Sequence, residues 1–126
     1  MSVLVDSSVW IAYFREQTPD GDRLETLIDE GLILTNDLIL AELLPPLRIQ
    51  RKHKLAALLR DIRTLPLDID WEEIVDHQVM CLKHGINRVG IADLIIAQNA
   101  ARHGVPLYSF DKHFRLMAGH IGLDMF

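Results

Sequence analysis

The chain has 126 residues, 49% of them apolar and 25% charged, and its formal net charge is -5 with a pI near 5.6. This length suits a single domain, residues 1-126, and the composition excludes a disordered chain. The acidic balance argues against a protein that binds nucleic acid simply through a basic surface.

Strand and helix signals alternate from the first residues onward. Ser2 to Asp6 is a short β-like run, and Ser7 or Ser8 can cap a helix that continues through Phe14. Further helices are expected at residues 22–30, 52–61, 71–84, 91–103 and 112–118, in addition to the helix that carries Glu42. Further strands are expected at residues 32–35, 65–67, 105–109 and 122–125.

This alternation predicts an α/β fold, in which helices cover both faces of a parallel sheet. Residues 65–67 suit only an edge strand, because a proline lies among them. Asn36 or Asp37 can cap the helix that carries Glu42. Pro45-Pro46 should break or kink that helix, because proline lacks the backbone N–H that a helix interior uses.

Four acidic residues each follow or interrupt an apolar run. Asp6 ends the first strand, Asp111 follows the late strand, and Glu42 and Asp93 lie inside apolar runs. A carboxylate in apolar surroundings is costly unless it is paired or binds a cation. Ligands bind outside the carboxyl ends of parallel strands, where the strand order reverses. If the first and late strands are neighbours, all four carboxylates should therefore meet at one edge of the sheet.

Four like charges at one edge would repel each other and raise one another's pKa values. Divalent cations would relieve that repulsion, and all-oxygen ligation favours Mg²⁺ or Mn²⁺ over zinc. The histidines show no metal-ligand spacing and are assigned to the surface, with only His113 near one of the four acids. They are His53, His77, His84, His103, His113 and His120.

Each acid also has an ordinary structural interpretation. Asp6 and Asp93 could be helix N-caps, and Asp111 could be a turn residue. Ser8 and Ser109 are candidates for hydroxyls that support the acids or a metal-bound water. Helix capping and strand ends explain these two serines nearly as well.

Cysteine content and hydropathy indicate the compartment. The single cysteine, Cys81, cannot form an intramolecular disulfide, and we expect it to lie on a helix and pack in the protein core. No apolar run approaches the roughly 18 residues of a membrane span, and no signal peptide is visible. We therefore expect a cytoplasmic protein without a membrane partner.

Basic residues gather in one segment despite the acidic balance. Arginine, lysine and histidine are dense between residues 48 and 63. The segment is either a solvated connection between helices or a patch that faces phosphate or a partner protein.

Four blocks of this sequence resemble those of PIN-domain nucleases. The first begins at Asp6-Ser7-Ser8-Val9-Trp10, and the second is Leu38-Ile39-Leu40-Ala41-Glu42-Leu43. The third is Ile91-Ala92-Asp93-Leu94-Ile95, and the fourth is Leu107-Tyr108-Ser109-Phe110-Asp111. Their order and the chain length resemble the VapC-type ribonuclease toxins of toxin–antitoxin pairs, over essentially the whole chain.

The resemblance implies a PIN-like three-layer fold and an endoribonuclease that hydrolyses RNA phosphodiester bonds with Mg²⁺ or Mn²⁺. By position, Asp6, Glu42, Asp93 and Asp111 match the catalytic, metal-binding acids, and Ser109 matches the family's hydroxyl residue. It also implies a homodimer and a cognate antitoxin protein. Apolar residues on the first helices and in Leu43-Leu44-Pro45-Pro46-Leu47 exceed what one small core needs, which favours a dimer and a groove for the antitoxin.

The sequence departs from the family at two places. Members often carry another acid two residues after the fourth one, where this chain has His113. Pro45-Pro46 also follows Glu42 unusually closely. A catalytically silent PIN-like scaffold that only binds a protein or RNA partner is the alternative, and the intact set of acids argues against it.

Overall fold

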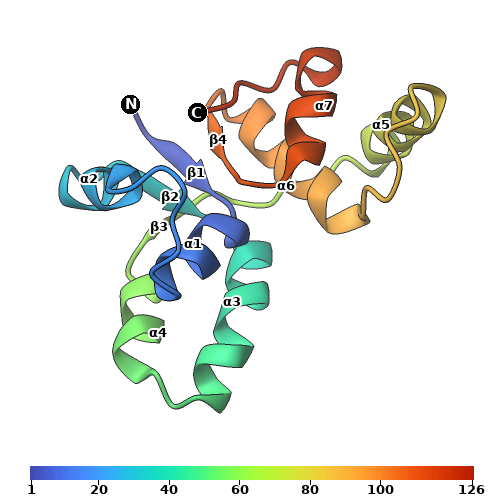
Figure 1. Cartoon of the computed structure of the whole chain (residues 1–126). Coiled ribbons are helices and arrows are strands. Elements are labelled where there is room, and N and C mark those ends of the chain that lie inside the picture. Colours follow the sequence, from blue (N-terminus) through green and yellow to red (C-terminus); the bar gives the residue numbers. More distant parts are fainter.

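Strand β1 (Val3–Val5) is an inner strand of a four-stranded parallel sheet. The structure is a computed structural model that describes residues 1–126. The strand order is β3-β2-β1-β4, with β2 at Ile33–Thr35, β3 at Arg63–Thr64 and β4 at Leu107–Tyr108 (Figure 1). Leu4 aligns with Leu34 on one side and with Leu107 on the other. All three residues of β1 are fully buried, as strands covered on both faces require.

Seven helices surround this sheet. They are α1 (Ser7–Phe14), α2 (Arg23–Asp29), α3 (Asp37–Ile49), α4 (His53–Arg60), α5 (Trp71–Lys83), α6 (Ile91–Arg102) and α7 (Lys112–Ile121). Helices α1, α3 and α4 lie below the strands in Figure 1, whereas α6 and α7 lie above and beside them. The predicted α/β architecture with helices on both faces is confirmed. None of the helices has the length and apolar character that a membrane crossing needs.

The strand order reverses next to β1. From β1 the chain moves to β2 and β3 on one side, and it later returns to place β4 on the other side. The Asp6 N–H donates to the Tyr108 carbonyl, 2.9 Å away, so the carboxyl ends of β1 and β4 lie side by side. The first and late strands are therefore neighbours, which was the condition for bringing the acids together.

Several element ends differ from the sequence prediction. Asp6 is the N-cap of α1 in place of Ser7 or Ser8, which confirms its alternative interpretation as a helix cap. Asn36, one of the two residues expected to cap α3, is its N-cap. The expected edge strand at 65–67 is instead β3, two residues earlier, where no proline interrupts the pairing. The expected last strand at 122–125 is reduced to one bridge between Leu107 and Met125. Cys81 is buried in α5, as expected.

The predicted break at Pro45-Pro46 is wrong, because α3 runs through both prolines. Proline at these positions leaves two carbonyls of the preceding turn, those of Ala41 and Glu42, without a helical donor. Ala41, Glu42 and both prolines are exposed, so water can satisfy these carbonyls. The opposite face of α3 is held in the core by its buried residues Ile39, Leu43 and Leu47.

A buried pair of amides fixes α3 against α6. The Asn36 side chain accepts from the Ile39 N–H at 2.8 Å and donates to Asn99 Oδ1 at 2.9 Å. Asn99 in turn donates to the carbonyl of Pro66 at 2.9 Å. Both asparagines are almost fully buried, so an unpaired amide there would be costly. This chain of hydrogen bonds sets the relative position of the helices that carry Glu42 and Asp93.

We predict that Asn36→Ala lowers the free energy of unfolding by about 1–3 kcal/mol, since it removes a helix cap and leaves the side-chain oxygen Oδ1 of Asn99 unpaired. Urea unfolding measures the change. Asp22→Ala is the matched control, because Asp22 is the N-cap of α2 and makes no side-chain cap bond. Equal losses in the two variants would contradict the role given to the buried amides.

Candidate active site

Asp6 is the most buried of the four acids and is held by two serine hydroxyls. Its side chain is 5% exposed, directly beyond β1. Ser8 Oγ donates to Asp6 Oδ2 at 2.8 Å, and Ser109 Oγ donates to the same oxygen at 2.9 Å. The structure shows no hydrogen bond to Asp6 Oδ1, so that oxygen stays available to a ligand.

The same two hydroxyls also hold the loop after β4. Phe110 N–H donates to Ser8 Oγ, and Asp111 N–H donates to Ser109 Oγ, both at 3.0 Å. Each serine therefore joins Asp6 to the backbone that carries Asp111. Ser8 and Ser109 lie beside the acids, and their hydrogen bonds position Asp6 and Asp111 relative to each other.

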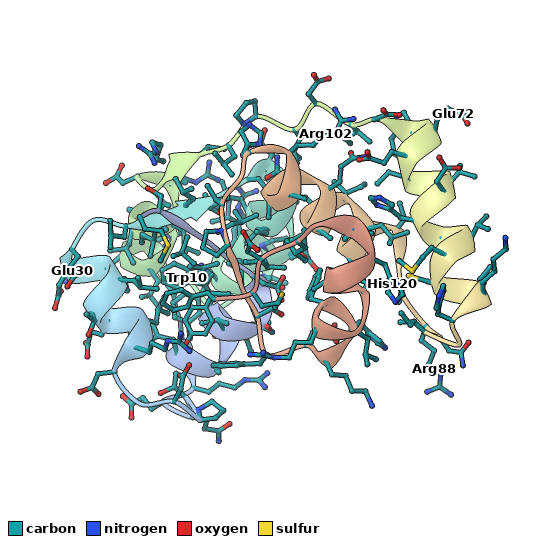
Figure 2. All side chains as sticks on the ribbon, turned by 90° about the horizontal axis from the view of Figure 1, so that it is seen from above. Trp10, Glu30, Glu72, Arg88, Arg102 and His120 are labelled. Carbon is teal, nitrogen blue, oxygen red and sulfur yellow. The ribbon has the colours of Figure 1, made fainter.

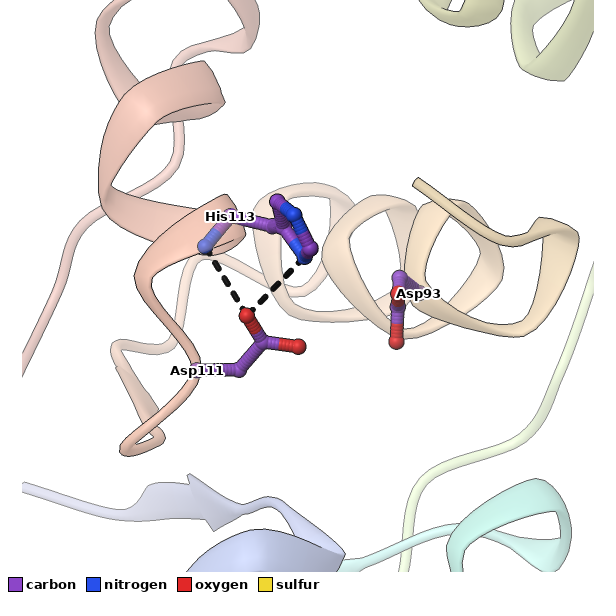
Figure 3. A group of neighbouring side chains, drawn as sticks. All are labelled: Asp93, Asp111 and His113. Carbon is purple, nitrogen blue, oxygen red and sulfur yellow. Dashed lines mark hydrogen bonds and ion pairs between the residues drawn. The ribbon is translucent and has the colours of Figure 1, made fainter. Parts of the chain in front are cut away.

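Asp111 begins helix α7 and lies against a histidine. Asp111 Oδ1 accepts from the His113 N–H at 2.9 Å, so Asp111 is the N-cap of α7. His113 Nδ1 lies 3.0 Å from the same oxygen, an ion-pair distance when the ring is protonated, although it makes no hydrogen bond. Figure 3 shows the histidine ring above the Asp111 carboxylate and Asp93 to its right. Asp111 is thus both a helix cap and a member of the acidic group.

Asp93 lies in the first turn of α6 but is not its N-cap, which is Gly90. Burial raises the pKa of the Asp93 carboxyl, and the charge of Asp111 raises it further. A hydrogen bond from the Gly90 backbone lowers this pKa. Among the smaller effects, the charge of Asp6 raises the pKa and that of His113 lowers it. The N-cap interpretation of Asp93 is therefore wrong, and its surroundings destabilise the charged form.

Glu42 projects from α3 toward the same edge of the sheet. The side chain is exposed on one side, because the buried face of α3 passes through Leu43 rather than through Glu42. Partial burial still raises the Glu42 pKa, as do the negative charges of Asp6 and Asp93, while a hydrogen bond with Ser7 lowers it. The structure thus brings Glu42 into electrostatic contact with two of the other acids.

Sequence reasoning missed His113. It was assigned to the surface, yet its side chain is only 21% exposed, and Asp93, Asp111 and His113 each offer a ligand atom within 4.8 Å of the others. The available signal was its position two residues after Asp111, where PIN-domain sequences often carry an acid. The surface assignment is also wrong for His77, whose Nδ1 atom is buried without a partner.

The donor set fits a divalent cation. Three aspartates and one glutamate converge, and the raised pKa values of Glu42 and Asp93 show that their negative charge is poorly balanced by the protein alone. Carboxylates suit Mg²⁺ and Mn²⁺, and an imidazole beside them suits Mn²⁺ better than Mg²⁺. Asp93, Asp111 and His113 are closest together and would hold the ion. Asp6, whose Oδ1 accepts no hydrogen bond, would be a further oxygen ligand.

The molecule is an α/β protein with a parallel sheet. Its acidic site lies at the carboxyl ends of the strands, where the strand order reverses. The PIN domain family model matches residues 3–120. The chain therefore belongs to the PIN domain family, which confirms the resemblance seen in the sequence. A comparison with curated proteins gives no significant match.

Three solved structures share the fold over nearly their whole length. VapBC2 from Rickettsia felis, bound to a DNA fragment from its promoter, has a TM-score of 0.74 at 17% identity and covers 100% of this chain and 98% of its own. FitAcB from Neisseria gonorrhoeae has a TM-score of 0.73 at 22% identity, with 98% and 96% covered. VapBC-5 from Mycobacterium tuberculosis, a member of the VapBC family of toxin-antitoxin systems, has a TM-score of 0.67 at 26% identity, with 99% and 98% covered.

We predict that the metal-free protein loses stability as pH rises. Because the pKa values of Glu42 and Asp93 are raised in the folded state, that state binds protons more tightly than the unfolded chain. The destabilisation is absent below the ordinary carboxyl pKa and complete above the raised one. Asp93→Asn should flatten this dependence and melt at or above the wild type without metal. A hundredfold excess of Mn²⁺ over its Kd should add about 2.7 kcal/mol to the wild type and less to the variant.

Melting curves in EDTA and in Mn²⁺, recorded from below the ordinary carboxyl pKa to above the raised values, measure both effects. Glu30→Gln, which removes one exposed charge from the end of α2, is the control and should behave as the wild type. A metal-free Asp93→Asn protein that melts lower, with an unchanged shift on adding Mn²⁺, would show that Asp93 only stabilises α6.

Proposed function

We propose that this protein is an endoribonuclease dependent on Mg²⁺ or Mn²⁺ and the toxin of a type II toxin–antitoxin pair, acting in the cytoplasm. One observation carries the proposal: Asp6, Glu42, Asp93 and Asp111 interact electrostatically at the reversal of strand order in a PIN-family chain. The similarity to VapBC structures supports the toxin role.

The chain's own groups suit hydrolysis of a phosphodiester bond. When bound, the cation supplies Lewis-acid activation of water and stabilises charge on the leaving oxygen. The hydroxyls of Ser8 and Ser109 hold Asp6 in a single orientation, which preorganises the site. Glu42 is exposed on one side and has a raised pKa, so it suits accepting a proton from the attacking water.

Cleavage of total RNA tests this activity. We expect cleavage with Mg²⁺ or Mn²⁺, none in EDTA, and a fall of at least about a hundredfold in Asp6→Asn and Asp93→Asn with the fold retained by circular dichroism. Glu30→Gln makes the same change of charge far from the site and should retain full activity. Full cleavage in EDTA would refute metal dependence, and no cleavage under any condition would favour the silent scaffold.

A groove between α1 and α3 supports an antitoxin partner. It has a volume of about 160 Å³ and includes Ile11, Phe14, Leu43, Pro46 and Leu47 among its lining residues. Ile11 is 40% exposed there, so the groove presents apolar surface to water. The expected groove beside the Leu43–Leu47 segment thus has a physical counterpart, and inhibition by the product of the adjacent reading frame tests its use.

We propose a different surface for the homodimer from the one that the sequence suggested. Leu43 and Leu47 are used in the core, so that segment holds less surplus apolar surface than expected. Four apolar residues on one stripe of α5 remain in water: Trp71, Val75, Val79 and Leu82, which are 58%, 56%, 43% and 67% exposed. Their spacing of three or four residues places them along one face of the helix.

We predict that Val75→Lys converts a dimer into a monomer, measured by light scattering at micromolar concentration. The reason is that a charge in the centre of the stripe would have to be desolvated on pairing. Leu116→Lys is the control, since Leu116 is 52% exposed on α7 and lies outside the stripe. A wild-type monomer, or a dimer that survives Val75→Lys, would refute this interface.

A further inference from the structure

The helical hairpin α3–α4 holds an unusual share of the protein's positive charge. Residues 48–60, from the last turn of α3 to the end of α4, contain five of the 13 lysines and arginines and no acid. The whole chain nevertheless carries a net charge of -5. Positive charge is therefore concentrated on this hairpin, and the remainder of the molecule is strongly acidic.

The two helices of the hairpin enclose a hollow with basic walls. It has a volume of about 300 Å³ and is lined by Leu44 and Arg48 of α3 and by His53, Ala56, Ala57 and Arg60 of α4. The small side chains of Ala56 and Ala57 leave room between the arginines. Arg48, His53 and Arg60 are all exposed to solvent, so a ligand can reach them.

These basic side chains have no acidic partner in the protein. The ion pairs of the structure join Arg102 to Asp70 and Glu73, and His113 to Asp111. Unpaired arginines from two helices around one hollow are suited to an anion, because the planar guanidinium matches the oxygens of a phosphate.

Helix stability accounts for only part of this arrangement. Arg48 and Arg60 lie in the last turns of their helices, where positive charge is favourable. In contrast, Lys52 is the N-cap of α4 and His53 and Lys54 begin it, with no acid in the first turn. Positive charge at a helix N-terminus opposes the helix dipole. These residues weaken α4, and a bound anion would offset that effect.

We propose that this hollow binds backbone phosphates of the RNA substrate, away from the bond that is cut; the proposal rests on the ribonuclease function proposed above. The acidic site repels a polyanion, so affinity for RNA has to come from basic residues outside it. The hairpin is suitably placed, because α3 also carries Glu42. Arg48 follows Glu42 by six residues, a rise of about 9 Å along the helix.

Phosphates fit this hollow better than an acidic segment of a protein partner does. The hollow is open and its apolar lining is limited to Leu44, Ala56 and Ala57, and the large exposed apolar side chains of the same hairpin, Ile49 and Leu58, are not among its lining residues. Other large exposed apolar side chains, which could anchor a protein partner, lie on α5 and in the α1–α3 groove. Phosphate contacts need charge and access rather than an apolar pocket.

The test is RNA binding by the full chain in the Asp6→Asn background, which prevents cleavage, with Mg²⁺ present. A fluorescein-labelled single-stranded RNA of about 20 nucleotides reports binding by anisotropy across a salt series, since each phosphate contact contributes about 0.7 to the salt slope. Arg48→Gln/Arg60→Gln should reduce the slope by about 1.4 and weaken binding at least about tenfold at 50 mM salt.

The matched control is Lys83→Gln/Arg88→Gln, which removes the same charge from the connection between α5 and α6. Arg88 lies at the end of the molecule opposite Trp10 in Figure 2, and α5 lies far from the hairpin in Figure 1. Both residues are exposed, and neither is in an ion pair. The control should change the salt slope little.

The outcomes separate the two proposals. If the Asp6→Asn protein binds RNA and Arg48→Gln/Arg60→Gln binds it equally well, the hollow is not a phosphate site, while the ribonuclease proposal stands. If neither protein binds RNA, the RNA substrate itself is wrong. Equal losses of RNA affinity in the hairpin variant and the control would show that binding depends only on the overall charge, and would refute the hollow as a phosphate site. Unchanged RNA binding with weakened binding of the antitoxin would assign the hairpin to the protein partner instead.

Discussion

The parallel pairing of β1 with β4 is the constraint on which the site depends. These strands are separated by more than a hundred residues, yet the Asp6 N–H donates to the Tyr108 carbonyl, and Ser8 and Ser109 both donate to the same oxygen of Asp6. Asp6 is therefore the last residue of the sheet ladder, the cap of α1 and the acceptor that joins two loops. A carboxylate with these roles cannot move without loosening the chain around it, so the position of one acid is set by the fold itself.

Glu42 and Asp93 are held at an electrostatic cost. Glu42 and Asp93 have raised pKa values because burial and neighbouring negative charges disfavour their ionised forms. The fold resists this repulsion through neutral contacts located away from the charges. Asn36 and Asn99 join α3 to α6, and Gln98 donates to the Asp70 carbonyl and to Glu73, which ties α6 to the start of α5. The helices that carry the acids are thus fixed by buried amides, and the acids themselves contribute repulsion, as expected of a site organised for a cation.

The sequence was sufficient to predict the α/β architecture from local patterns, and it predicted that the acids meet on the condition that the first and late strands are neighbours. Short apolar runs alternating with helical periodicity indicate a parallel sheet, and Asp6 and Asp111 each follow such a run. What was missed depends on tertiary context. Whether Pro45-Pro46 breaks a helix depends on whether Leu43 and Leu47 are held in a core, and no local rule shows that. His113 looked like a surface residue because the sequence does not show that Asp93 lies across from it. The polar residues Asn36, Gln98 and Asn99 look ordinary in sequence, although all three are buried.

The distribution of charge follows from these constraints. A site of four carboxylates favours a cation and repels the phosphates that it is proposed to cut. A bound ion would reverse the sign of the electrostatic potential only in its immediate surroundings. Lysines or arginines at the sheet edge would pair with the acids and compete with the proposed cation. Positive charge must therefore lie at a distance but on a rigid connection to the site. Helix α3 meets this condition, since its first half carries Glu42 beside Asp6 and its last turn carries Arg48. A helix that continues through Pro45-Pro46, where a break was expected, keeps these two ends at a constant separation, and this gives the unbroken helix a physical role beyond the packing of the hairpin.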